Sequence, residues 1–126
     1  MLLHLTEHSS ESLQSQVIRQ IRAKILAGEL TENDILPSIR VFSRDNKVSA
    51  ITIRRSYELL EREGLIHSRV GKGFYVTGID NNTKKTMAIE KLEENYGSAV
   101  RNAFEEGLSE DEIRKSMDKV IKKHRK

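Results

Sequence analysis

The chain has 126 residues, which is enough for one ordinary domain or for a small domain with an appendage. Its 37% hydrophobic and 33% charged residues exclude a disordered chain, and the lack of cysteine excludes disulfides, cysteine-bound zinc and thiol catalysis while fitting a reducing cytoplasm. The net charge of +3 identifies no partner, no apolar stretch is long enough to span a membrane, and the first eight residues do not resemble a signal peptide.

The first predicted element is a helix over residues 12–27. Apolar residues recur there at every fourth position, which is the spacing of one helix face. Gly28 follows as the glycine that typically ends a helix. The stretch from Glu29 to Leu36 is predicted to be a connection. The apolar face carries Leu13, Val17, Ile21 and Ile25.

Two further helices are predicted, each with a serine at its start. Ser38 caps a short helix that fades near Asn46, with Ile39 and Phe42 pointing inward. Ser49 caps a third helix over residues 50–63. One face of this third helix carries Ile53, Tyr57 and Leu60, and we interpret all three as core residues.

A β-hairpin is predicted after the third helix. Two runs rich in apolar and β-branched residues, 65–68 and 74–77, flank the sequence V-G-K-G at 70–73. Glycine permits the positive φ of a tight turn, so this pattern is typical of a hairpin. Two strands alone are marginal in water, and the hairpin must therefore pack on the helices. A turn-rich linker is predicted over residues 78–83.

Two more helices are predicted beyond the linker. The first covers residues 84–106 and ends at Gly107-Leu108, a pair typical of a Schellman motif. A capping box, Ser109 to Glu112, begins the second. The long helix carries an apolar stripe made of Ile89, Leu92, Tyr96, Ala99, Val100, Ala103 and Phe104.

The order of elements predicts a winged helix-turn-helix fold, mostly α-helical with one small hairpin. In this fold one helix enters the major groove of DNA, a second supports it, and the hairpin serves as a wing. Residues 36–77 carry eight lysines and arginines against four acidic residues. A local excess of positive charge suits a DNA-binding face, although a solvated surface would explain it as well.

Three segments of residues 12–77 resemble the GntR family of bacterial regulators. They are L-P-S-I-R at 36–40, T-I-R-R-S-Y-E-L-L-E-R-E-G-L-I at 52–66 and G-K-G-F-Y-V at 71–76. The resemblance implies DNA contacts from the second helix, the start of the third and the wing. Many members have arginine where this chain has Ala50, and Arg44 or Arg55 could compensate. The implied contact residues are Arg40, Ser49, Thr52, Arg54, Gly71, Lys72 and Gly73.

Structural explanations stand beside these roles. Arg40 could pair with an acidic residue of the first helix, and Ser49 could be only a cap. Turn geometry by itself explains Gly71 and Gly73.

The last 48 residues decide the subfamily. They are too few for the larger effector domains of this family, and a tail of two helices resembles the YtrA subfamily, which implies dimerisation. We therefore expect a DNA-binding domain at 1–78 and a dimerisation tail at 79–126, paired through the apolar stripe. The alternative is a tail that packs only on its own winged helix.

No active site is evident in the sequence. The four histidines are scattered, and only His4 and His8 share helical spacing, so we expect no metal, cofactor or catalytic residue. We expect a cytoplasmic homodimer that represses transcription from an inverted-repeat operator in double-stranded DNA. A small-molecule effector and activation in place of repression stay open. The alternative function is a protein-interaction module without specific DNA binding.

Overall fold

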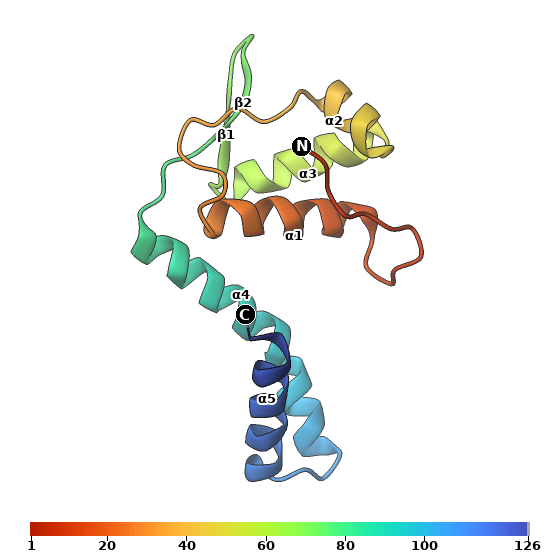
Figure 1. The fold of residues 1–126 in the computed structure, drawn as a ribbon, viewed down its shortest axis with the longest axis vertical. Coiled ribbons are helices and arrows are strands. Elements are labelled where there is room, and N and C mark those ends of the chain that lie inside the picture. Colours follow the sequence, from red (N-terminus) through yellow and green to blue (C-terminus); the bar gives the residue numbers. More distant parts are fainter. Residues whose placement is uncertain (126) are drawn as a thin grey trace. The chain divides into compact units, whose positions relative to one another are not determined.

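Figure 1 shows the fold of residues 1–125, the part of the chain that the computed structural model describes. The elements in these residues are α1 (Leu13–Leu26), α2 (Ile39–Asn46), α3 (Ala50–Arg62), β1 (Ile66–Arg69), β2 (Gly73–Val76), α4 (Asn81–Glu105) and α5 (Glu110–His124). They form two compact units, Met1–Lys84 and Lys85–Lys126. The predicted fold class is confirmed. No helix in the described residues is long and apolar enough to cross a lipid bilayer.

Serine side chains begin the three helices of the first unit. Ser12, Ser38 and Ser49 each have extended backbone, and each hydroxyl accepts a hydrogen bond from the backbone N–H three residues on. Gly28 and Gly64 follow α1 and α3 with φ of 85° and 80°, a conformation that glycine adopts without strain. These helices therefore begin and end within one residue of the predicted positions.

The core of the first unit lies between α1 and α3. Tyr57 of α3 is fully buried at its centre. Its ring meets Phe42 of α2 edge-on at 5.9 Å and Phe74 of β2 at 5.0 Å between ring centroids. Ile39, predicted to point inward, is half-buried. Other fully buried side chains are Val17, Ile21, Ile25, Ile53, Leu60 and Leu65.

The hairpin is antiparallel and is shifted by one residue from the predicted strands. Ile66 pairs with Val76, and Arg69 pairs with Gly73, which leaves residues 70–72 as the loop. The shift follows from Gly71 and Gly73, which both adopt positive φ, at 70° and 95°, and so fix where the chain reverses.

Residues 33–36 are more than the predicted connection, because their backbone pairs with β2. The N–H of Val76 donates to the carbonyl of Asp34 at 2.8 Å, and the N–H of Leu36 donates to that of Phe74 at 2.9 Å. Ile35 forms an antiparallel bridge with Tyr75. This pairing adds a short third segment beside the two strands of the hairpin. It also connects the hairpin to the chain that leads into α2.

The long helix α4 begins at Asn81, three residues before the predicted start, so the linker is shorter than expected. The reason is Asp80, whose Oδ1 accepts a hydrogen bond from the N–H of Thr83 at 2.8 Å, as an N-cap residue does. This hydrogen bond, together with one from the Thr83 hydroxyl, holds the pKa of the Asp80 carboxyl below its usual value.

Both predicted motifs between α4 and α5 are present. The N–H of Leu108 donates to Ala103 O and that of Gly107 to Phe104 O, each at 3.0 Å, which is the Schellman pattern. Ser109 and Glu112 exchange side-chain and backbone hydrogen bonds as a capping box. The bonds from Ser109 lower the pKa of the Glu112 carboxyl.

Candidate nucleic-acid interface

The amino-terminal turn of α3 presents polar and basic side chains to solvent. Arg54 and Arg55 are exposed, and neither side chain forms an ion pair or hydrogen bond within residues 1–125. The Ser49 hydroxyl accepts from the N–H of Thr52 at 3.2 Å and lies 2.9 Å from its hydroxyl. Ser49 therefore caps α3. Because Ser49 is exposed, its hydroxyl is also accessible to a binding partner.

Arg40 lies in the first turn of α2 and is exposed. The alternative in which it pairs with an acidic residue of α1 is not observed, because its side chain has no partner in the described part of the chain. Arg44, one turn later, lies 3.4 Å from Asp45 in an exposed ion pair. Exposed pairs of this kind contribute little to stability, so Arg44 remains available to another anion.

The wing carries Lys72 at its tip, in the loop between β1 and β2, exposed and unpaired among residues 1–125. Arg69, at the end of β1, donates to Asn33 Oδ1 at 2.8 Å and lies 4.1 Å above the ring of Tyr75. Arg69 was not among the predicted contact residues. These contacts show that Arg69 stabilises the wing. No sequence motif distinguishes it from a solvated arginine.

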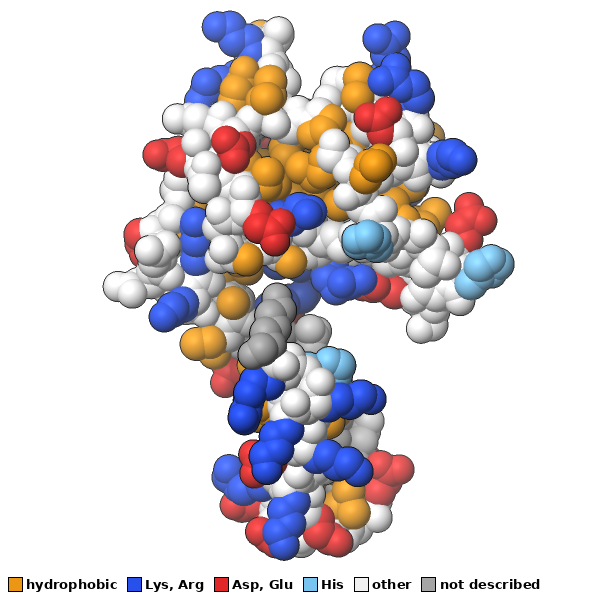
Figure 2. All heavy atoms as spheres, viewed as in Figure 1, with side chains coloured by type: hydrophobic (Ala, Val, Ile, Leu, Met, Phe, Trp, Pro, Cys, Tyr) orange, Lys and Arg blue, Asp and Glu red, His pale blue; other side chains and the backbone are white. Residues whose placement is uncertain are grey.

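Figure 2 shows lysine and arginine side chains at the ends of two projections of the first unit, one over the hairpin and one over α2. Helix α3 lies beneath α2 in the same unit (Figure 1). Basic side chains of residues 36–77 therefore lie on the hairpin and on α2, at the same side of the first unit in this view. This arrangement suits contacts to phosphates on both sides of a groove.

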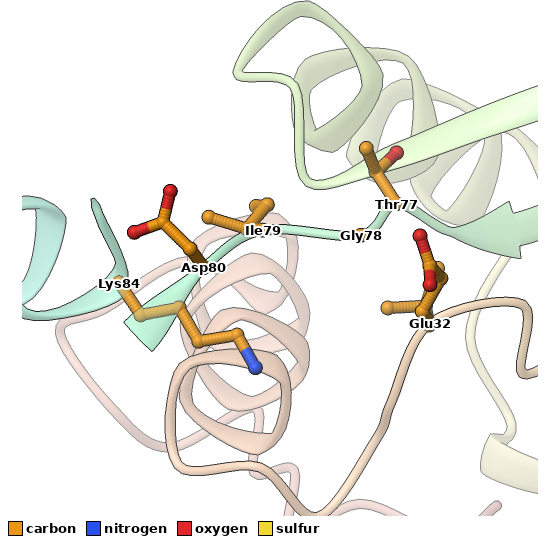
Figure 3. Close-up of a pocket in the computed structure, with 7 residues that line it drawn as sticks. Glu32, Thr77, Gly78, Ile79, Asp80 and Lys84 are labelled. Atoms are coloured by element: carbon orange, nitrogen blue, oxygen red, sulfur yellow. The ribbon is translucent and has the colours of Figure 1, made fainter. Parts of the chain in front are cut away.

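A shallow hollow lies at the segment that joins β2 to α4 (Figure 3). It is lined by Glu32, Val76, Thr77, Gly78, Ile79, Asp80 and Lys84. A Cβ on Gly78 would fall 1.8 Å from Oε1 of Glu32, so glycine lets this carboxylate lie against the backbone. Within residues 1–125 no group of three or more histidine or acidic side chains is placed to hold a metal ion.

The apolar stripe of α4 divides into two sets in the tail. Tyr96, Ala99, Val100 and Ala103 line one hollow together with Ile113 and Met117 of α5. Ile89, Leu92 and Phe104 remain more than half exposed, at 54%, 56% and 52%. The first set therefore lines the hollow between α4 and α5, and the second is exposed apolar surface on α4.

A family model described as "Bacterial regulatory proteins, gntR family" matches residues 13–76. The HTH-type transcriptional regulator YhcF of Bacillus subtilis is 29% identical over 83% of this chain and 86% of its own. The HTH-type transcriptional repressor YtrA of the same organism is 30% identical over 72% of this chain and 68% of its own. The DNA-binding domain of AraR, solved in complex with operator ORX1, is 26% identical with a TM-score of 0.52, covering 61% of this chain and 95% of that domain.

The matched residues run from the start of α1 to the end of β2, so they include every residue of the winged helix-turn-helix that carries the exposed basic groups. The resemblance to YtrA that was expected from the sequence is confirmed. The match with YtrA covers 91 residues, so it extends beyond the winged helix-turn-helix into the tail. The chain belongs to the GntR family of bacterial regulatory proteins and is a transcriptional regulator.

Proposed function

We propose that this regulator is a homodimeric repressor whose two α3 helices read successive major grooves of an inverted-repeat operator. The observation that carries the proposal is the unpaired Arg54 at the exposed start of α3, together with the exposed and unpaired side chains of Arg40 on α2 and Lys72 on the wing. A helix fits the major groove, and unpaired arginine can donate two hydrogen bonds to guanine.

The contact residues divide by the kind of DNA group that suits them. Arg54 and Thr52, on the first turns of α3, are proposed to read base edges, with Arg55 in support. Phosphate contacts are assigned to Arg40, Arg44 and the Ser49 hydroxyl, and the wing adds Gly71, Lys72 and Gly73. Phosphate contacts supply salt-dependent affinity, whereas base contacts supply selectivity.

The tail, residues 79–126, is proposed to pair two copies of the chain. Two sets of exposed apolar side chains support this role: Ile89, Leu92 and Phe104 on α4, and Val120 and Ile121 on α5. Apolar surface of this kind is stabilised when a second copy covers it. Two-fold pairing would place the α3 helices of the DNA-binding domains, residues 1–78, on half-sites about 34 Å apart. Such a repressor acts at promoters in the cytoplasm. The proposal leaves open whether a small-molecule effector binds it.

The proposal is tested by fluorescence anisotropy with DNA from upstream of the protein's own gene, against scrambled DNA of equal length, at two salt concentrations. Tight binding that is selective and weakens steeply with salt is expected, because several phosphate contacts release counterions. Equal and weak binding to both DNAs, repeated with a set of genomic fragments, would favour the protein-interaction module instead.

Replacing Arg54 with alanine is expected to weaken operator binding by about 1–3 kcal/mol while leaving binding to scrambled DNA nearly unchanged, because a base contact is lost. Arg62→Ala is the matched control: Arg62 is exposed and unpaired at the opposite end of the same helix, within the described residues. Anisotropy titrations of both folded variants check the prediction. Equal operator affinity for the two variants would refute base reading by Arg54.

A further inference from the structure

The first six residues form an extended arm along the first unit. Met1, Leu3 and Leu5 are half-buried, whereas Leu2, His4 and Thr6 are exposed. This alternation is that of a β-strand with one covered face. We call residues 1–6 the N-terminal arm.

Three side-chain carboxamides hold the N-terminal arm in place of a neighbouring strand. Gln16 accepts from the N–H of Thr6 at 3.0 Å and donates to its carbonyl at 2.9 Å. Gln20 makes the same pair of bonds with His4, at 2.9 and 2.7 Å. A carboxamide offers one acceptor and two donors, so it can satisfy a backbone as another strand would.

The third carboxamide, Asn46, differs because it lies on α2. Its Oδ1 accepts from the N–H of Leu3 at 2.8 Å, and its Nδ2 donates to Met1 O and to Phe42 O, each at 3.1 Å. The arm is thus bonded to α1 at two points and to the last residue of α2 at a third.

The turn from α2 to α3 begins at Asn46 and contains backbone strain. Lys47 has φ of 55°, a left-handed conformation that costs a residue with a side chain roughly 1 kcal/mol or more. Surrounding bonds hold it: the N–H of Val48 donates to Ser43 O at 3.1 Å, and the Ser43 hydroxyl donates to Val48 O. Ser49, the cap of α3, follows directly.

We propose that the N-terminal arm fixes the α2–α3 turn through Asn46 and thereby sets how selectively α3 reads DNA. Asn46 is a positioning residue, since it acts through the turn rather than by touching DNA. The inference rests on the proposed function, because it assigns selectivity to α3. A strained turn keeps a single conformation only when the surrounding contacts hold it. The arm supplies two of the hydrogen bonds of Asn46, the residue at which this turn begins.

Leu3→Pro tests the coupling in the free protein, because proline lacks the N–H that Asn46 accepts. Hydrogen exchange at the amides of Val48 and Thr52 is expected to become about fivefold faster, the effect of losing one neutral hydrogen bond. Leu2→Pro is the matched control, since Leu2 is exposed and its N–H has no partner in the described residues. Leu3→Ala keeps the backbone N–H, so it shows separately the effect of losing the leucine side chain.

Unchanged exchange at both amides in folded Leu3→Pro, or equal acceleration in Leu2→Pro, overturns the coupling. Asn46→Ala gives a second route to the same result if Leu3→Pro does not fold, and it should accelerate the same amides.

The DNA measurement separates this inference from the proposed function. The ratio of dissociation constants for scrambled and operator DNA is expected to fall about fivefold in Leu3→Pro and Asn46→Ala. It is expected to stay constant in Gln20→Ala, which removes one of the two attachments of the arm to α1 and leaves the bonds to Asn46 in place. Wild-type protein without selectivity overturns the proposed function, and the selectivity step with it. Selective wild-type protein with an unchanged ratio in both variants overturns only the present inference.

Discussion

Replacing Ile89 and Leu92 together with aspartate is expected to give a folded monomer that binds its operator about 10²–10⁴-fold more weakly. Both side chains are more than half exposed in one protomer, so the substitutions remove little from its interior. In the proposed dimer they lie in the interface, where an unpaired buried carboxylate is strongly unfavourable. Monomers engage one half-site at a time and lose the gain of bivalent binding.

Light scattering gives the oligomeric state, circular dichroism the fold, and anisotropy the affinity. The matched control is Ser98→Asp with Asn102→Asp, which adds the same charge to exposed positions of α4 outside the apolar stripe. An intact dimer in the folded Ile89 and Leu92 double variant would contradict the role assigned to the tail.

Helix ends were predictable from the sequence because their causes are local. Ser38 and Ser49 cap helices through bonds to backbone N–H groups three residues away, and Gly28 and Gly64 end helices by adopting positive φ. The winged helix-turn-helix followed from these ends, since they fix the number, length and order of its helices. The capping box at Ser109 is local in the same way.

Pairing between distant segments was not predictable in the same way. Residues 33–36 follow no strand periodicity, yet their backbone pairs with β2, about forty residues later, because a short hairpin needs a neighbour. The cap at Asp80 was local but was missed, since the sequence D-N-N-T is equally typical of a turn.

The exposed residues of the candidate site follow from helix periodicity, but the contacts that hold the site do not. Gln16 is 2% exposed, although glutamine on a helix usually indicates a solvated face. Its partners are backbone groups of Thr6 and Glu11, and those of Asn46 include Met1, which no spacing rule identifies. The apolar stripe of α4 was predicted as one surface, but only part of it lines the hollow against α5 and the rest is exposed.

Tyr57 is expected to be the most sensitive position of the first unit. It is fully buried, contacts the rings of Phe42 and Phe74, and donates to the carbonyl of Pro37 at 2.8 Å. Burial raises the pKa of its hydroxyl, so the hydroxyl stays protonated and able to donate to a higher pH than in an exposed tyrosine. One side chain thus joins α3 to α2, to the wing and to the segment that precedes Arg40.

Tyr57→Ala is expected to lower the free energy of unfolding by about 3–5 kcal/mol, because it leaves a cavity at the centre of the core. Tyr57→Phe keeps the ring and leaves Pro37 O without its donor, for a loss of about 1–3 kcal/mol. Urea titrations followed by circular dichroism measure both, with Tyr75→Phe as the control, because its hydroxyl makes no hydrogen bond within residues 1–125.

The pH dependence of stability distinguishes the contribution of the Tyr57 hydroxyl from that of its ring. Because the folded state holds the pKa of Tyr57 above its unfolded value, its contribution is complete below about pH 10 and is lost as pH rises further. The alkaline loss of stability should therefore be smaller in Tyr57→Phe than in wild-type protein or Tyr75→Phe. Equal alkaline losses in all three proteins, with Tyr57→Phe as stable as Tyr75→Phe at neutral pH, would show that the hydrogen bond to Pro37 does not contribute to stability.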